Sequence, residues 1–212
     1  MEASRTYLPA AGHDWLLPLY DPMVKLLGGD AARRALVEQA QLQRGQRVLE
    51  VGSGTGTLST MIKKLHPAVD VAGLDPDGKA LARAQRKAAR ERLEIKFDQG
   101  FADQLPYPEK SFDRVFSAFM FHHLPAEERV PMLREARRVL KPGGEFHMLD
   151  FEGSDHGAHS FLARIFHASE RLKDNSEARV LSLMNESGFV GAKKVGGRKM
   201  LFGDVAYYRA TV

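Results

Sequence analysis

The chain has 212 residues, of which 43% are hydrophobic, and this is enough for one domain with a sizeable core. Its net charge of +4 is only mildly basic, so it gives weak support for an anionic partner. The chain contains no cysteine, which excludes disulfides and thiolate metal sites and fits a reducing compartment.

Residues 1–45 precede the first predicted strand. They contain no signal peptide, and no run of the chain is long and apolar enough to span a bilayer, so we expect a cytoplasmic protein without a membrane span. Two prolines interrupt short helices, and a longer helix is predicted over 31–42 with Asp30 as its cap. We therefore predict a helical N-terminal cap over 1–45 and a main region over 46–212, which together form one structural domain.

Three alternating glycines follow the first predicted strand, Arg47–Val51, and a helix is predicted over 55–66. The loop residues are Gly52, Ser53, Gly54, Thr55 and Gly56. Glycine permits the unusual backbone angles of a tight turn and keeps Cβ atoms away from a ligand, while free N–H groups at the helix start face it. The order of strand, turn and helix is typical of a nucleotide-type site at the carboxyl edge of a parallel sheet. The alternative is a glycine-rich connection without a ligand.

The second predicted strand, over 69–75, ends in an acidic residue. A carboxylate about 20 residues after the first glycine can accept hydrogen bonds from both hydroxyls of a ribose. Asp75 can instead cap the next helix, predicted over 77–90, but Asp77 suits that cap better and leaves Asp75 free. We therefore expect Asp75, with Pro76 beside it, to lie at a ribose.

Basic residues gather on one face of the helix over 77–90. They are Arg83, Arg86, Lys87 and Arg90. A solvated outer face explains them better than a nucleic-acid patch, because apolar residues occupy the opposite face. No nucleic-acid-binding module is recognisable either, so we expect no nucleic-acid partner.

Further strands are predicted over 93–98, 112–119, 145–151, 190–195 and 205–212, with helices over 126–140 and 176–187.

Two histidines follow the fourth predicted strand, over 112–119, on the same edge of the sheet as the glycines. An unperturbed imidazole titrates near neutral pH, so either His122 or His123 can be a general base. The alternative is a helix cap or a packing contact. His156 and His159 are weaker candidates, and no histidine spacing indicates a metal site.

Together these segments resemble the class I S-adenosylmethionine-dependent methyltransferases. Glu50, two residues before the first glycine, gives the chain the family's pattern (D/E)-x-G-x-G-x-G. Further similar segments read G-F-A-D-Q-L-P-Y over 100–107, F-D over 112–113 and R-V-L-K-P-G-G over 138–144. A dinucleotide site would instead have its third glycine where Thr57 stands.

The resemblance implies an α/β fold. It is a three-layer sandwich with a seven-stranded, mostly parallel, doubly wound sheet, an antiparallel last strand in a C-terminal hairpin, and a helical N-terminal cap. The implied cofactor is S-adenosylmethionine. Glu50 and the glycine-loop backbone would hold its amino-acid end, and the carbonyl of Ser117 would accept from the same ammonium. The loop at Gly100, Phe101 and Ala102 would flank the adenine, with Phe101 in place of the usual acid, so that an aromatic ring can stack on the base or cover it.

The implied function is methyl transfer to a small, partly apolar acceptor by in-line displacement, with S-adenosylhomocysteine as product. The protein must align the acceptor, exclude water and, where needed, remove a proton. His122 or His123 would be the base, and His122 would also lie beside the cofactor. The segment (N/D)-P-P-(Y/F), which binds planar amino groups, is missing. The resemblance is nearest to enzymes of quinone biosynthesis, lipid-amine methylation and natural-product methylation.

Aromatic residues outside the matched segments are candidates for an apolar acceptor pocket, and residues 152–175 form a predicted amphipathic lid. The aromatic candidates are Trp15, Tyr20, Phe161 and Phe166. Two other functions stay open. An NAD-type oxidoreductase would use the same sheet edge, and a non-catalytic methyltransferase-like partner protein would keep the fold without the cofactor. Glu50, the intact glycines and Asp75 argue against the second alternative, while Phe101 argues for it.

Overall fold

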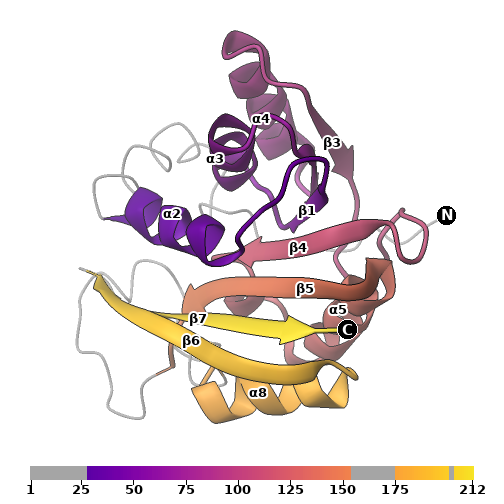
Figure 1. Cartoon of the computed structure of the whole chain (residues 1–212). Helices are drawn as coiled ribbons and strands as arrows, with labels where there is room; N and C mark the ends of the chain where they lie inside the picture. Colours follow the sequence, from indigo (N-terminus) through magenta and orange to yellow (C-terminus); the bar gives the residue numbers. More distant parts are fainter. Residues whose placement is uncertain (1–27, 154–174, 201–202) are drawn as a thin grey trace, which may run out of the picture.

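A single mixed sheet forms the centre of the fold (Figure 1). The computed structural model describes residues 28–153, 175–200 and 203–212. Across these residues the sheet has seven strands in the order β3-β2-β1-β4-β5-β7-β6. Their bounds are β1 (Arg47–Val51), β2 (Asp70–Asp75), β3 (Ile95–Gln99), β4 (Phe112–Ala118), β5 (Leu140–Phe151), β6 (Val190–Met200) and β7 (Gly203–Thr211). The strands β1 to β5 pair in parallel and β7 runs antiparallel to both β5 and β6, which confirms the predicted antiparallel last strand.

The direction in which the chain winds reverses at β1. From β1 the chain moves outward to β2 and β3, and it then returns to place β4 on the other side of β1. Open parallel sheets bind ligands at such a reversal, in the crevice outside the carboxyl ends of the strands. The glycine loop that follows Val51 therefore lies at the topological switch point of this sheet.

Helices cover both faces of the sheet, which confirms the three-layer prediction (Figure 1). Their bounds are α2 (Gly29–Gln39), α3 (Thr57–Leu65), α4 (Gly78–Arg90), the 3-10 turn η2 (Phe121–His123), α5 (Ala126–Val139) and α8 (Glu177–Glu186). On one face, Leu36 of α2 and Ile62 of α3 are fully buried in one cluster with strand residues. On the other face, Leu133 of α5 and Leu183 of α8 pack in a second cluster. Each such burial contributes roughly 1.5–3 kcal/mol, so apolar contact holds both helical layers to the sheet.

The first two helices begin differently from the predictions because glycines precede them in left-handed conformations. Gly28, with φ of +91°, is the N-cap of α2, and its cap has no side-chain hydrogen bond. Asp30 lies in the first turn, so its predicted role as the cap is wrong. Gly56, with φ of +72°, cannot belong to a right-handed helix, and α3 begins at Thr57 rather than two residues earlier.

The start of α4 agrees with the prediction. The carboxylate of Asp77 accepts hydrogen bonds from the backbone N–H groups of Lys79 and Ala80 at 2.8 and 3.2 Å, which is the geometry of an N-cap. The predicted apolar face of this helix is also buried. Its buried residues are Ala80, Leu81, Ala84 and Ala88. Two of the basic residues on the other face, Arg86 and Arg90, are exposed to solvent.

Two strands are longer than predicted. β5 begins at Leu140 rather than at 145, and β6 continues to Met200 rather than ending at 195. The pairing of β4 with β5 shifts register between Phe112 and Arg114. Such an irregularity lets a strand accommodate a proline that has no N–H to donate, so Pro142 can lie within β5.

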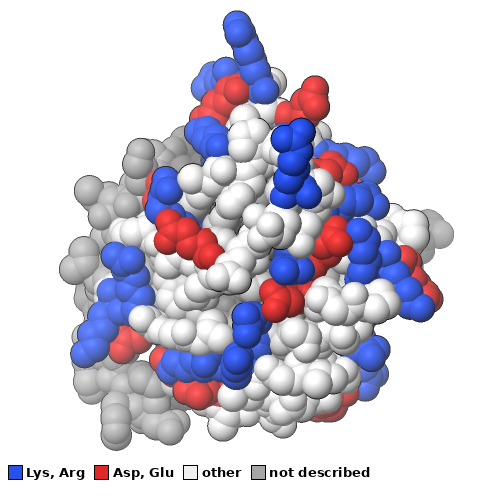
Figure 2. Space-filling model, viewed as in Figure 1, with Lys and Arg blue, Asp and Glu red and all other residues white. Residues whose placement is uncertain are grey.

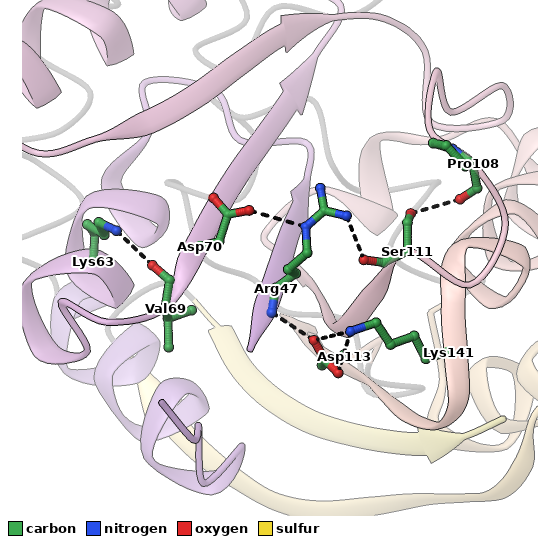
Figure 3. A network of polar contacts seen from close by, with 8 residues as sticks. All are labelled: Arg47, Lys63, Val69, Asp70, Pro108, Ser111, Asp113 and Lys141. Atoms are coloured by element: carbon green, nitrogen blue, oxygen red, sulfur yellow. Dashed lines mark hydrogen bonds and ion pairs between the residues drawn. The ribbon is translucent and has the colours of Figure 1, made fainter. Parts of the chain in front are cut away.

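A polar network joins the amino ends of the central strands, at the edge of the sheet away from the glycine loop (Figure 3). Asp113 accepts from the backbone N–H of Arg47 at 2.8 Å and from Nζ of Lys141 at 2.8 and 2.9 Å. Nε of Arg47 donates to Asp70 at 3.2 Å. Asp113 of the segment F-D and Lys141 of the segment K-P-G-G therefore hold neighbouring strands together. This structural role is enough to explain why the two segments occur in the chain.

The helix α2 belongs to the same apolar core as the sheet, because Leu36 and Val37 are fully buried against strand and α3 residues. The proline-interrupted helices predicted before Gly28, and most of the lid predicted over 152–175, lie outside the described residues. The division of the chain at residue 45 stays a prediction.

Candidate active site

The glycine loop is fixed to the end of β2 by backbone hydrogen bonds. The N–H groups of Gly52 and Ser53 both donate to the carbonyl of Leu74, at 2.8 and 2.9 Å. The N–H of Gly56 closes the turn by donating to the carbonyl of Ser53 at 2.8 Å. All three glycines have positive φ, of +77°, +50° and +72° in chain order, so the loop has the left-handed backbone that the sequence predicts.

The three glycines are needed for different reasons. A Cβ on Gly56 would lie 2.8 Å from Cβ of Ala84 and 2.9 Å from the ring of Phe97, so this glycine lets α3 pack closely. A Cβ on Gly52 would collide with the side chain of Met120, which covers this first glycine. A Cβ on Gly54 would meet none of the described residues within 4 Å. The middle glycine is therefore the one that faces open space, where a ligand can approach the backbone.

Asp75 ends β2 next to this open glycine. Its Oδ2 accepts the N–H of Gly54 at 2.7 Å, and its Oδ1 accepts the N–H of Asp77 at 2.9 Å. Burial raises the pKa of Asp75 to about 6, and these two hydrogen bonds oppose the rise. Asp75 is thus tied to the backbone on both oxygens and is not free as predicted, but each carboxylate oxygen keeps a second lone pair for a hydroxyl.

The loop after β3 is attached to the same strand end. The N–H of Gly100 donates to the backbone carbonyl of Asp75 at 3.2 Å, and Nε2 of Gln99 donates to the carbonyl of Pro76 at 2.9 Å. Phe101 and Ala102 follow, both half-buried. The structure therefore brings the predicted adenine-flanking loop beside the predicted ribose-binding residues.

Glu50 is buried under the glycine loop. Its Oε2 accepts the backbone N–H of Ser59 at 2.8 Å and also the Ser59 hydroxyl. Burial raises the pKa of Glu50 to about 7, while the Ser59 hydrogen bonds and the nearby charge of Arg33 lower it. A small cavity of about 40 Å³ lies against Glu50, Arg33 and the first part of the glycine loop. Asp75 does not line this cavity, so a ligand that touches both acids must extend beyond it.

A strained residue connects β4 to this cavity. Phe119 has φ of +58°, which costs a bulky residue roughly 1–3 kcal/mol and is typical of functional sites. Its N–H donates to the carbonyl of Leu149 at 2.8 Å, which holds the turn in place. The turn lets the next residue, Met120, pack over the glycine loop. The guanidinium of Arg33 lies over the Phe119 ring, 5.0 Å from its centre.

His122 forms a buried pair with an acid at the end of β5. Nδ1 of His122 lies 2.6 Å from Oδ1 of Asp150, and the His122 backbone N–H donates to Oδ2 at 3.1 Å. Burial alone would raise the pKa of Asp150, but the charge of His122 and three hydrogen bonds, including one from the N–H of Phe151, hold it below its ordinary value. An ionised Asp150 keeps the proton on Nδ1, so Nε2 of His122 can act as a base.

The second histidine lies next to the first. The ring of His123 lies against the ring of His122, with centres 4.0 Å apart, and is half-buried. Ser117 is fully buried within β4, and its hydroxyl has no hydrogen-bond partner among the described residues. The expected role of the Ser117 carbonyl stays a prediction.

All predicted site residues from Glu50 to His123 thus lie at one edge of the sheet. Arg33, Met120 and Asp150 are also there, and the sequence interpretation missed them. Asp150 had a usable signal, since an acid at the end of the fifth strand belongs to the same edge. The candidates His156, His159, Trp15, Tyr20, Phe161 and Phe166 lie outside the described residues.

The described part of the chain offers no group of three His, Cys, Asp or Glu residues that could hold a metal ion. Within the same residues, no helix has the length and apolar character needed to cross a membrane. Figure 2 shows Lys and Arg interspersed with Asp and Glu over the face in view. This face therefore does not present a large field of one sign.

Comparison with known proteins identifies the family. Residues 48–144 match the family model of the methyltransferase domain. Over 154 residues, the chain is 36% identical to the demethylmenaquinone methyltransferase of Thermus thermophilus, with 71% of this chain and 69% of that protein covered. The chain belongs to the class I S-adenosylmethionine-dependent methyltransferases.

Other members of this methyltransferase family give the same result. The demethylmenaquinone methyltransferase of Deinococcus radiodurans is 35% identical over 154 residues, which cover 71% of this chain and 63% of that protein. The chain thus spans about two thirds of the length of these two relatives. A solved S-adenosylmethionine-dependent methyltransferase from Aquifex aeolicus has the same fold, with a TM-score of 0.69, 20% identity, and 89% of this chain and 92% of that chain covered. The comparisons support neither an oxidoreductase nor a non-catalytic partner.

The site also fits the family's cofactor, S-adenosylmethionine. A buried acid suited to an ammonium, Glu50, lies beside a cavity of about 40 Å³, which has room for a small polar group. Gly54 leaves open space above the loop, and Asp75 offers free lone pairs beside it. These features provide polar partners for an ammonium and for hydroxyl groups, which S-adenosylmethionine carries.

Proposed function

We propose that this methyltransferase methylates a ring carbon of a reduced quinone or a similar phenolic acceptor. Two observations support this acceptor. Both named relatives are demethylmenaquinone methyltransferases. The observation that carries the proposal is the His122–Asp150 pair, because a phenolic acceptor must lose a proton and this pair provides a base.

We also propose the residues that bind the cofactor. Glu50 and the loop Gly52, Ser53, Gly54, Thr55 and Gly56 would hold the amino-acid end, with the carbonyl of Ser117. Asp75 and Pro76 would hold the ribose, and Gly100, Phe101 and Ala102 would flank the adenine. His122 would lie between the cofactor and the acceptor. The support is their common position at the switch point of the sheet.

The chemistry divides between cofactor and protein. S-adenosylmethionine, when bound, supplies an electrophilic methyl group on a sulfonium that leaves as a neutral thioether. Nε2 of His122 removes the proton of a ring hydroxyl, and Asp150 stabilises the imidazolium that forms. The resulting phenolate carries negative charge onto its neighbouring ring carbon, which forms the new bond to methyl. The proton on that carbon would then pass to solvent, which restores the aromatic ring, and the imidazolium would return its proton to the ring oxygen.

The surroundings of His122 suit an aromatic acceptor. Phe151 lies edge-on to the His122 ring at 5.2 Å, and Phe119 lies 5.3 Å from Phe151. Apolar rings beside His122 can bury a ring-shaped acceptor and exclude water from it. Burial of the acceptor and exclusion of water both favour proton removal and methyl transfer. An amine acceptor already has a nucleophilic lone pair in its neutral form and has less need of this base.

The test is an assay with a methyl-labelled cofactor and a short-chain naphthoquinol. We expect a product with methyl on a ring carbon, identified by mass and NMR, and no product from the oxidised naphthoquinone, which has no hydroxyl proton to lose. His122→Ala is expected to lower kcat by roughly 10²- to 10⁴-fold, and His123→Ala by less than about tenfold. Methylation of amines alone, or equal effects of the two variants, would contradict the proposal.

Cofactor binding has a separate test. Calorimetry compares the affinity of S-adenosylhomocysteine for the wild type and for Asp75→Ala. We expect the variant to bind at least about tenfold more weakly, because the sugar loses a charged acceptor. Equal affinities would rule out the ribose-binding role of Asp75 and leave the acceptor question untouched.

A further inference from the structure

The helix α2 contributes a buried cation to the site. Arg33 is only 6% exposed and lines the same small cavity as Glu50 and the glycine loop. Its neighbour on the helix, Arg34, is exposed to solvent. A buried arginine is costly unless anions or acceptors surround its guanidinium, so the position of Arg33 calls for an explanation.

Within the described residues, Arg33 has few partners. Among these residues its guanidinium forms one ion pair, with Asp30 at 3.7 Å, which is beyond hydrogen-bond length. The guanidinium also lies over the face of the Phe119 ring. A guanidinium has five N–H donors, so these contacts leave capacity for a further acceptor at the cavity.

The cavity therefore has buried groups of opposite charge in its wall. Glu50 supplies a carboxyl group and Arg33 supplies a guanidinium cation, and both are more than nine-tenths buried. Their charges act on each other, but no hydrogen bond or ion pair between them is formed. Two separated charges of this kind suit a ligand that carries both an ammonium and a carboxylate.

We infer that Arg33 binds the carboxylate at the amino-acid end of the cofactor, opposite the ammonium at Glu50. This inference rests on the proposed function, which places S-adenosylmethionine at this edge of the sheet. A guanidinium matches a carboxylate with two parallel hydrogen bonds, and the Phe119 ring restricts its orientation. The helix α2 is then part of the cofactor site as well as part of the core.

Ligands that lack one charged group at a time test this assignment by calorimetry. S-adenosylhomocysteine has both the ammonium and the carboxylate, decarboxylated S-adenosylmethionine lacks the carboxylate, and 5′-methylthioadenosine lacks both. Arg33→Met keeps an apolar stem against Phe119 but removes the charge. We expect it to weaken S-adenosylhomocysteine by roughly 10- to 100-fold and to leave both ligands without a carboxylate within about twofold.

Two further variants make the result specific. Arg34→Met removes the same charge from the exposed face of the helix and is expected to change no affinity by more than about twofold. Arg33→Lys keeps the charge without the fork, and its loss of affinity should be smaller and still confined to S-adenosylhomocysteine. This variant decides the question if Arg33→Met does not fold, as monitored by circular dichroism.

The failure of the inference differs from the failure of the proposed function. If the wild type binds S-adenosylhomocysteine but the Arg33 variants bind it equally well, the inference alone is overturned. Equal losses for S-adenosylhomocysteine and 5′-methylthioadenosine also overturn it, because the effect would not depend on the carboxylate. If the wild type binds none of the three ligands, the proposed function and the inference fall together.

Discussion

His122, in the turn η2 that follows β4, contacts Asp150 near the end of the neighbouring strand β5, with 2.6 Å between the imidazole Nδ1 and the carboxylate Oδ1. Asp150 is fully buried and accepts from three donors, two of them backbone N–H groups. The acid is therefore fixed in position before any acceptor arrives. A histidine held in this way presents one defined nitrogen to the site.

Replacing Asp150 with asparagine should impair catalysis without impairing cofactor binding. An amide has one acceptor oxygen for three donors, and it has no charge to stabilise the imidazolium that forms on His122. We expect kcat to fall by roughly 10²-fold or more, with the affinity for S-adenosylhomocysteine changed by less than about threefold. Steady-state kinetics and calorimetry measure the two quantities.

The control for Asp150 is an acid at the same sheet edge that does not contact a histidine. Asp204, in β7, is exposed, and Asp204→Asn is expected to keep the wild-type kcat. If Asp150→Asn lowers cofactor affinity as much as kcat, then Asp150 supports the structure of the site rather than the base.

Glu50 should make the stability of the protein depend on pH in an unusual direction. Burial raises its pKa from 4.5 to about 7, so between these values the native state holds a proton that the unfolded chain has lost. Stability therefore falls as pH rises through this window. Relative to Glu50→Gln, which cannot ionise, the wild type should lose about 2.5 kcal/mol of unfolding free energy between pH 5 and 8.

Urea denaturation of both proteins across this pH range gives the difference directly. Asp75 has a raised pKa too, but it is present in both proteins and its contribution cancels in the comparison. A difference that stays constant with pH would mean that Glu50 is not shifted in the folded protein.

The glycines of the loop should separate stability from binding. Gly56→Ala adds a Cβ within 3 Å of Ala84 and Phe97 at positive φ, and we expect a loss of roughly 2–5 kcal/mol of stability. Gly54→Ala adds a Cβ in open space, so only the backbone strain of about 1–2 kcal/mol remains. This second variant should nevertheless bind S-adenosylhomocysteine at least about tenfold more weakly, because the new methyl group lies where the ligand approaches.

Thermal unfolding and calorimetry on both glycine variants measure these effects. The opposite pattern, with Gly54→Ala binding normally, would show that the open space above the loop is not the cofactor site.

The features predicted correctly from the sequence are those whose signals are local. The alternating glycines mark the switch point because only their backbone angles fit the turn, and Asp77 caps α4 through N–H groups two and three residues away. The cap of α2 shows the limit of such signals. Asp30 is a good capping residue by type, but Gly28 takes the left-handed position and the helix begins before Asp30.

The features missed from the sequence depend on contacts between distant segments. Asp150 meets His122 only because β4 pairs with β5 in one particular register. Arg33 and Arg34 are adjacent in the sequence, and only the orientation of α2 on the sheet buries one and exposes the other. No local pattern contains the strand register or the orientation of α2, although the position of Asp150 at the end of the fifth strand indicates the edge of the sheet to which it belongs.

Asp113 should matter for stability and not for binding. Although burial alone would raise its pKa, the Arg47 N–H and the Lys141 ammonium hold the pKa of Asp113 below its ordinary value, at the sheet edge away from the glycine loop (Figure 3). Its stabilising effect is therefore present at neutral pH and is lost as the pH falls, because the unfolded chain takes up the proton first. We expect Asp113→Ala to cost about 1–3 kcal/mol at neutral pH, less in acid, and to leave S-adenosylhomocysteine affinity unchanged. Glu94→Ala, at an exposed acid, is the control for urea denaturation, and a loss of affinity in Asp113→Ala would show that the two edges of the sheet are coupled.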